Sequence, residues 1–422
     1  MTNDSPVEIV LLPEDDAMHP VEEVSNFNES AYYNFFDRSR RAGGWVRIGN
    51  RPNEGYAEMT VCFYEPDGKA SFMWKKPEIH DNRAHDAGGL RFEVVEPWKE
   101  HGVAYRGSAC TLANPLDMAD PSAAFRNNPI EKVDLDIRWL GLSPGWGGEP
   151  RRRLPDGSYE SAAKGDASTQ FARGHFEQHG AAKGKLGIGG REYTIDGFGL
   201  RDHSWGPRYW QNTGYYRWLT MNFGEDLGLM GLVSERGGGR ESSHGYLYER
   251  GKPNTVIERV ELDTDFTGEQ QVHDRLRVRL HPAGGAPIEI AGRVLSLVPC
   301  RNRRAGWVTR VSEGMTEWQL GDRVGYGMSE HLGPMTFGGG QQALFLKGAG
   351  IAAEREYSED TARAIDSETR AIIDRIYDRV RGLITDRKLV LLAAAAELKA
   401  KETLEGDRLR HLLAGEPLEE KR

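Results

Sequence analysis

From about Gly43 to Glu330 the chain is a succession of short alternating segments separated by turn residues. Val133–Trp139 alternates strictly between apolar and polar residues, as a strand with one solvated face does. Val61–Tyr64 and Ala70–Trp74 flank a Pro-Asp-Gly turn, which predicts a β-hairpin. No convincing long amphipathic helix interrupts this region. The pattern therefore predicts a mainly β body, folded as one large sandwich or as two barrels.

Four more strands are expected at barrel-like spacing within this body. They are Tyr215–Phe223, Leu227–Ser234, Val256–Leu262 and Ile288–Val298. The stretch from Gly141 to Asp166 is polar and does not alternate. It predicts a long loop, either a lid over a pocket mouth or a solvated surface excursion.

The pattern becomes helical after the glycine run at residues 338–340. Ser358, followed by two acidic residues, is a typical helix start, and apolar residues then recur by threes and fours as far as Leu383. A second, alanine-rich helix is expected over 387–401 and a short third one up to Leu413. Each apolar stripe must be covered by another helix, by the β body or by another chain, so homo-oligomerisation through this tail is one expectation.

Charge and composition exclude several classes of protein. The chain has 55 Lys and Arg against 64 Asp and Glu, a net charge of −9, which argues against non-specific nucleic-acid binding. No run approaches the roughly 18 apolar residues of a membrane span, and residues 1–5 lack the features of a secretion signal. Only three cysteines occur, too few and too far apart for a disulfide framework or a cysteine zinc site. We therefore expect a cytoplasmic protein with no membrane span and no nucleic-acid partner.

Three segments near the C-terminus carry a family resemblance: Tyr326–Pro334 (YGMSEHLGP), Tyr357–Asp366 (YSEDTARAID) and Lys401–Gly406 (KETLEG). In order and spacing they resemble the end of the peptidase domain of FtsH-type AAA+ metalloproteases, over roughly residues 326 to 415. The chain has no His-Glu-x-x-His sequence and no Gly-x-x-x-x-Gly-Lys-Ser/Thr loop. Because zinc-dependent hydrolysis by that domain needs both histidines and the glutamate, we expect no protease activity and interpret the tail as a scaffold or oligomerisation segment.

A second resemblance lies in the β body. Gly197–Arg208 (GFGLRDHSWGPR), preceded by Gly174–Gln178 (GHFEQ), resembles the tandem lipocalin-like superfamily over about residues 25 to 335. That group includes carotenoid 1,2-hydratases, kievitone hydratase and AttH-like proteins. The resemblance implies two lipocalin-like antiparallel β-barrels, each with an apolar lumen, and a hydrophobic ligand such as an isoprenoid, steroid or polyketide.

Together the two resemblances divide the chain into four parts. These are an N-terminal extension (1–24), a first barrel (25–190), a second barrel (191–337) and an α-helical tail (338–422).

The candidate catalytic residues are Asp202, His203 and Tyr216. Asp202 and His203 could serve as proton donor and base, because burial raises a carboxyl pKa and histidine titrates near neutrality. Tyr216 or Trp205 could face a developing carbocation. Since residues two apart share a strand face, Arg201, His203 and Trp205 would point away from Asp202 unless a bulge intervenes. A purely structural role for this cluster, fastening the two barrels, stays open.

Further residues are candidate ligand contacts. Arg208 or Arg201 could hold a carboxylate, and Trp45 and Arg47 could line a lumen, with core packing and a solvated face as the plainer alternatives. The full set of candidate ligand contacts is Arg201, Trp205, Arg208, His175, Glu177, Trp45 and Arg47.

His175, Glu177 and His179 would share one strand face and could in principle offer three metal ligands. One strand spaces such side chains about 6–7 Å apart, so they rarely converge without help from elsewhere. We therefore predict no metal and no cofactor, and a hydrogen-bonded polar strand.

Three functions fit these observations. The first is a cofactor-free hydratase, dehydratase or isomerase acting on an apolar substrate. The second is a carrier that binds such a molecule without converting it. The third is an interaction protein assembled through its tail, including a catalytically inactive relative of FtsH. We favour a protein that binds a hydrophobic small molecule, with hydro-lyase or isomerase activity as its enzymatic form.

Overall fold

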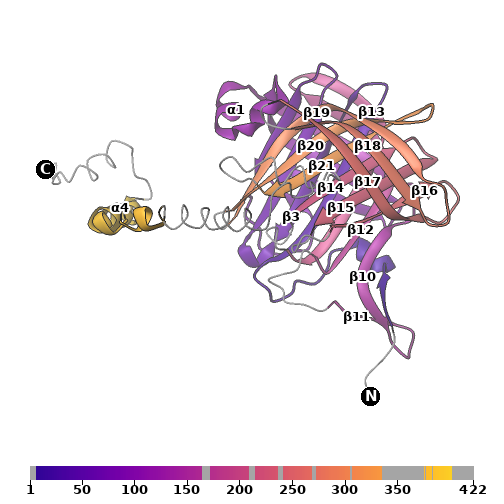
Figure 1. Cartoon of the computed structure of the whole chain (residues 1–422), viewed down its shortest axis with the longest axis horizontal. Coiled ribbons are helices and arrows are strands. Elements are labelled where there is room, and N and C mark those ends of the chain that lie inside the picture. Colours follow the sequence, from indigo (N-terminus) through magenta and orange to yellow (C-terminus); the bar gives the residue numbers. More distant parts are fainter. Residues whose placement is uncertain are drawn as a thin grey trace, which may run out of the picture. The chain divides into compact units, whose positions relative to one another are not determined.

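The computed structural model describes residues 6–163, 172–208, 214–235, 241–268, 272–304, 307–334, 375, 377–382 and 384–401. Within these ranges the protein is mostly β, and the predicted fold class is confirmed (Figure 1). Of the helix predicted from Ser358 to Leu383, residues 375 and 377–382 are described and are helical, whereas the short helix predicted up to Leu413 lies outside the described residues.

The first β unit contains thirteen strands connected as one antiparallel sheet. The strands are β1 (Val7–Val10), β2 (Phe27–Asp37), β3 (Ala42–Arg51), β4 (Tyr56–Tyr64), β5 (Ala70–Lys75), β6 (Asp86–Ala87), β7 (Leu90–Glu96), β8 (Glu100–Leu112), β9 (Ile130–Gly141), β10 (Trp146–Arg153), β11 (Tyr159–Ser161), β12 (Gly174–Ile188) and β13 (Arg191–Pro207). The short helices are η1 (Pro13–Asp16), η2 (Pro52–Glu54), η3 (Pro115–Ala119) and α1 (Pro121–Asn127). Pairing runs through β12, β13, β2, β3, β4, β5, β8 and β9 and returns to β12, so these strands close into a ring.

The second unit is a closed antiparallel barrel of eight strands in sequence order. They are β14 (Tyr215–Asn222), β15 (Leu227–Glu235), β16 (Glu241–Glu249), β17 (Thr255–Thr267), β18 (Val272–Pro282), β19 (Ile288–Arg304), β20 (Trp307–Leu320) and β21 (Arg323–Pro334). The FtsH-like stretch Tyr326–Pro334 lies in β21, which closes the barrel by pairing with both β20 and β14.

Two details differ from the sequence analysis. Part of the predicted loop from Gly141 to Asp166 forms strands β10 and β11, because β10 pairs with β12, β1 and β11. β13 pairs with β12 and β2 of the first sheet. We therefore place the boundary between the two β units after β13 rather than at residue 190.

Strand alternation gives each barrel a packed interior. Side chains such as Tyr33, Phe63 and Trp139 fill the first, and Leu229 and Trp318 belong to the cluster that fills the second. A third cluster contains side chains that point out of the two barrels and contact one another. Among them are Tyr32, Trp45, Phe72, Trp218, Tyr246 and Met328. The two barrels thus pack against one another through their outer faces.

The C-terminal unit is described over residues 375–401 with gaps, and α4 (Lys388–Lys401) confirms the second predicted tail helix. Among the described residues, every helix is too short or too polar to cross a lipid bilayer.

Candidate functional site

A cavity of about 2190 Å³ lies between the two β units and is lined by side chains from both. Its walls are side chains that point out of the barrels, such as Trp45 on β3 and Trp218 on β14. The side chains on the other face of the same strands point inwards and fill the barrel interiors. The cavity is therefore not a barrel lumen, which the family resemblance had implied.

The first unit contributes a row of residues on seven adjacent strands, each directly paired with the next. The row runs Trp146 (β10), Glu177 (β12), Asp202 (β13), Tyr32 (β2), Arg47 (β3), Thr60 (β4) and Trp74 (β5), and all seven line the cavity. Directly paired residues share one face of an antiparallel sheet, with Cβ atoms about 5 Å apart. The sheet register therefore sets an acid pair, a phenol and a guanidinium side by side, between two tryptophans.

The second barrel presents a matching row. It runs His244 (β16), Leu232 (β15), Trp218 (β14), Glu330 (β21) and Glu313 (β20), all lining the cavity. Hydrogen bonds join the two β units beside this row. Trp218 Nε1 donates to Glu177 Oε1 over 2.8 Å, and the Tyr64 hydroxyl donates to the Glu313 carbonyl over 3.0 Å.

Glu177 and Asp202 form an acid pair whose pKa values are shifted in opposite directions. Burial raises the pKa of Glu177 to about 8, and the negative charge of Asp202 adds to the effect. Burial acts on Asp202 in the same direction, but His175 and Arg208 outweigh it, so the pKa of Asp202 is lowered. His175 Nε2 hydrogen-bonds Asp202 Oδ2 and lies 3.8 Å from Glu177 Oε1, so one imidazole contacts both acids.

A second acid pair lies across the cavity. Glu313 and Glu330 face one another on β20 and β21, and burial raises the pKa of both carboxyls, with their mutual repulsion raising that of Glu313 further. The Tyr216 hydroxyl donates to Glu330 Oε1. Glu313 Oε2 is buried without a hydrogen-bond partner among the described residues. Carboxyls whose pKa is raised by burial thus line the cavity from both barrels.

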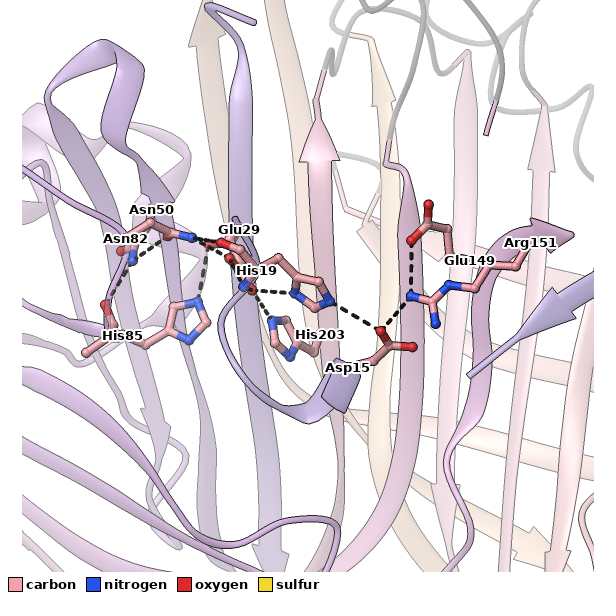
Figure 2. A network of polar contacts seen from close by, with 10 residues as sticks. Asp15, His19, Glu29, Asn50, Asn82, His85, Glu149, Arg151 and His203 are labelled. Carbon is pink, nitrogen blue, oxygen red and sulfur yellow. Dashed lines mark hydrogen bonds and ion pairs between the residues drawn. The ribbon is translucent and has the colours of Figure 1, made fainter. Parts of the chain in front are cut away.

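His203 belongs to a different site, on the opposite face of β13. Its Nε2 lies 2.9 Å from Glu29 Oε1, and His19 Nδ1 lies 2.8 Å from the same oxygen (Figure 2). Trp205 stacks on His19 with ring centroids 3.8 Å apart, and Arg201 Nη1 donates to Asp16 Oδ1 over 2.6 Å. These three residues of β13 therefore fasten the N-terminal segment to the first barrel.

The structure places the sequence-predicted residues in two groups. Those that line the cavity are Asp202, Tyr216, His175, Glu177, Arg208, Trp45 and Arg47. Those on the opposite face of β13 are Arg201, His203 and Trp205. Strand alternation had predicted that Asp202 and His203 point to opposite faces, and the structure agrees. The histidine that hydrogen-bonds Asp202 is His175.

The sequence analysis did not identify Glu313 and Glu330 as site residues. The only available signal was the alternation within 307–334, which puts the two glutamates on a common face once β20 and β21 are paired.

Among the residues that the structure describes, two clusters have ligand atoms within 4.8 Å of one another, as a metal site would: His19, Glu29 and His203, and His175, Glu177 and Asp202. In the first, Glu29 already accepts hydrogen bonds from the His19 main chain and from Asn82, besides both imidazoles. In the second, the positive charges of Arg208 and Arg47 act on Asp202 and would repel a cation. His179 bonds Asn222 Oδ1 over 2.6 Å instead of joining His175 and Glu177. We assign no metal to either cluster.

The fold and the site define a double β-barrel protein with an acid-lined cavity between its barrels. A family model described as a domain of unknown function, DUF7064, matches residues 12–335, and the chain belongs to this family. The model of peptidase family M41 matches residues 319–412, in agreement with the FtsH resemblance predicted over 326–415.

Curated relatives of the FtsH group match a short part of the chain. The ATP-dependent zinc metalloprotease FtsH of Magnetococcus marinus is 45% identical over 94 residues, which is 22% of this chain and 14% of that protein. FtsH of Acidobacterium capsulatum is 39% identical over 93 residues, again 22% of this chain and 14% of that protein. The chain thus spans about a seventh of the length of these relatives.

Two solved structures are similar to the β body. An AttH-like protein of Nitrosomonas europaea aligns with a TM-score of 0.49 at 12% identity, covering 79% of this chain and 99% of that one. Kievitone hydratase of Nectria haematococca aligns with a TM-score of 0.46 at 11% identity, covering 79% and 95%.

Proposed function

We propose that the chain binds a hydrophobic small molecule, such as an isoprenoid, steroid or polyketide, in the cavity between its barrels and acts on it as a cofactor-free hydratase, dehydratase or isomerase. The observation that carries this proposal is the pairing of Glu177 with Asp202. Neighbouring carboxyls whose pKa values are pushed apart supply a proton donor and a proton acceptor at the same pH.

The composition of the cavity wall supports an apolar ligand. Aromatic rings from both barrels line it, including Trp45, Phe72, Trp146 and Trp218. Its volume of about 2190 Å³ exceeds the roughly 300–1,000 Å³ typical of small-molecule pockets, so a large terpenoid or polyketide fits.

Hydration of an alkene would use this wall as follows. The Glu177 carboxyl gives its proton to one alkene carbon, and the π electrons form the new C–H bond. Water bonds to the neighbouring cationic carbon and loses a proton to Asp202, while the aromatic rings that line the cavity stabilise the cation. Dehydration is the reverse, and isomerisation results when Asp202 removes a proton from the adjacent carbon instead. His175 contacts both acids and can return the proton to Glu177.

The first test is native mass spectrometry of the purified chain before and after mild organic extraction. An apolar adduct that is lost on extraction supports the binding part of the proposal. No adduct, together with no thermal shift from terpenoid and steroid panels, contradicts it.

The second test incubates the extracted ligand with the protein in H₂¹⁸O and in D₂O. Oxygen-18 incorporation indicates hydration, and deuterium without oxygen-18 indicates isomerisation. Glu177→Gln should keep the ligand and lose turnover by about 10²–10⁴-fold, whereas Glu225→Gln, an exposed matched control, should leave turnover unchanged. A wild-type protein that binds the ligand, incorporates neither isotope and releases no water from the ligand would be a carrier.

For the tail we propose a scaffold or oligomerisation role. The sequence contains no His-Glu-x-x-His, and its match to the FtsH proteases covers only 14% of their length.

A further inference from the structure

Two phenols and two carboxyls line the cavity where the barrels face one another. Tyr32 lies on β2 of the first barrel. The other three residues belong to the second barrel, and they are Tyr216 on β14, Glu313 on β20 and Glu330 on β21. Tyr32 and Glu313 are each only 5% exposed, so the polar atoms of both side chains depend on partners inside the protein.

The contacts of Trp218 place Tyr32 next to the two glutamates. The Tyr32 and Trp218 rings meet edge to face with centroids 5.4 Å apart, and Trp218 is the cross-strand partner of Glu330. Glu330 in turn is directly paired with Glu313, and such pairs have Cβ atoms about 5 Å apart on one sheet face. Burial and the negative charges of both glutamates raise the pKa of Tyr32, in agreement with this proximity.

The hydrogen bonds of the acid pair leave an acceptor unused. The Tyr216 hydroxyl donates to Glu330 Oε1. Glu313 and Glu330 hydrogen-bond one another, which requires that a proton lie between the two carboxyls. Among the described residues, no N–H or O–H group donates to Glu313 Oε2. Because the shared proton needs only one oxygen of Glu313, this carboxyl can accept a further hydrogen bond.

The Tyr32 hydroxyl is a donor without an acceptor. It is buried and has no hydrogen-bond partner among the described residues. Asn34 acts on the pKa of Tyr32 against burial and the glutamates, as an amide N–H close to the phenol oxygen does, so it leaves the O–H proton unused. Buried polar groups without partners are costly, so a ligand group that satisfies both Tyr32 and Glu313 gains affinity.

We propose that Tyr32 and Glu313 form a subsite for a hydroxyl group, so that the ligand of this cavity is an apolar alcohol or phenol. This inference rests on the proposed function and narrows its ligand class. A hydroxyl accepts one hydrogen bond and donates another through the same oxygen. It can therefore accept from Tyr32 and donate to Glu313, whereas a carbonyl or an ether can only accept.

Trp218 links this subsite to the proposed catalytic pair. Its ring contacts Tyr32, and its N–H donates to Glu177. A ligand anchored by its hydroxyl therefore has its apolar body along the aromatic wall that leads to Glu177 and Asp202. The distance between the hydroxyl and the double bond of the ligand then determines which carbon meets the acids.

The test compares three ligands that differ in one group, by displacement of the fluorescent probe N-phenyl-1-naphthylamine from the full chain. Farnesol carries a hydroxyl, its methyl ether keeps the oxygen as an acceptor only, and the corresponding hydrocarbon has no oxygen. We expect farnesol to bind about tenfold more tightly than the ether. A purely apolar pocket would instead bind the ether and the hydrocarbon at least as tightly as farnesol.

Two substitutions separate the two hydrogen bonds. Glu313→Met removes the acceptor and should abolish most of the advantage of farnesol over the ether. Tyr32→Phe removes the donor and should weaken the binding of farnesol and of the ether alike, by about threefold to tenfold. Neither substitution should change the affinity for the hydrocarbon.

Each substitution has a matched control. Tyr33→Phe changes a phenol on the opposite face of β2, where its hydroxyl hydrogen-bonds His101 inside the first barrel. Glu225→Met changes an exposed glutamate. Both controls should keep the wild-type order of the three ligands. Glu313→Gln retains a carbonyl acceptor and should keep part of the farnesol advantage, and it replaces Glu313→Met if that variant fails to fold.

Each outcome decides one claim. A farnesol advantage that is absent in the wild type, or that survives Glu313→Met, overturns the hydroxyl subsite and leaves the apolar pocket standing. An affinity for the ether that is unaffected by Tyr32→Phe does the same. A chain that binds neither the probe nor any of the three ligands overturns the proposed small-molecule function itself.

Discussion

Trp218 of the second barrel donates its indole N–H to Glu177 of the first barrel over 2.8 Å, and both side chains are buried. This bond crosses the interface between the barrels at the acid that we propose as proton donor. The site therefore forms only when the two barrels pack together, because each barrel alone would expose its half of the cavity to water.

Trp218→Phe tests this coupling. The substitution keeps an aromatic ring in the interface but removes the N–H, so Glu177 loses a hydrogen bond that favours its ionised form. We expect a loss of about 1 kcal/mol in the free energy of unfolding, measured by urea denaturation, and a further rise in the pKa of Glu177. Trp74→Phe, at a half-exposed tryptophan, is the matched control, and equal stability of the two variants would contradict the bond.

Glu177 should make stability depend on pH in a defined window. Its pKa is about 8 in the folded protein against 4.5 ordinarily, so the folded chain keeps a proton that the unfolded chain loses between these values. The stabilising effect of this group is complete below pH 4.5 and is lost as the pH rises towards 8. Relative to Glu177→Gln, the wild type should lose at least about 1 kcal/mol between pH 5 and pH 8.

Urea denaturation of both proteins at each pH measures this difference, with Glu225→Gln as the control for a solvated glutamate. A difference between wild type and Glu177→Gln that does not change with pH would mean that Glu177 is ionised in the folded state.

His203→Ala should affect stability and not the cavity. His203 hydrogen-bonds the buried Glu29 and lies on the face of β13 opposite Asp202. Leaving a buried carboxylate short of one partner is expected to cost about 2 kcal/mol in unfolding free energy. The affinity for N-phenyl-1-naphthylamine should match the wild type at a temperature where both are folded. A variant with unchanged stability and lost turnover would instead make His203 a catalytic residue.

Deletion of the tail after residue 340 separates the two regions. All strands of both barrels end by Pro334, so the truncated chain should retain its β circular dichroism and its probe binding. If the tail assembles the protein, light scattering should show an oligomer for the full chain and a monomer for the truncated one. A mass that changes only by the deleted residues would rule out assembly through the tail.

The local geometry of the strands and helices could be predicted from the sequence. Strand alternation predicted the mainly β body and put Arg201, His203 and Trp205 on one face of a strand with Asp202 on the other. It also predicted the helix at Lys388–Lys401. These features depend on backbone periodicity and neighbouring residues, so they are contained in short stretches of sequence.

Which strand faces meet could not be predicted from the sequence, because it depends on how the two barrels close and pack. Glu177, Glu313 and Glu330 resemble solvated residues of half-buried strands in the sequence, yet barrel closure and barrel packing bury all three around one cavity. Glu29 hydrogen-bonds two histidines that are far from it in the sequence. His19 is 10 residues away and His203 is 174 residues away. The acidity of a carboxyl is set by its burial and by the charges around it, and both depend on residues that are distant in the chain.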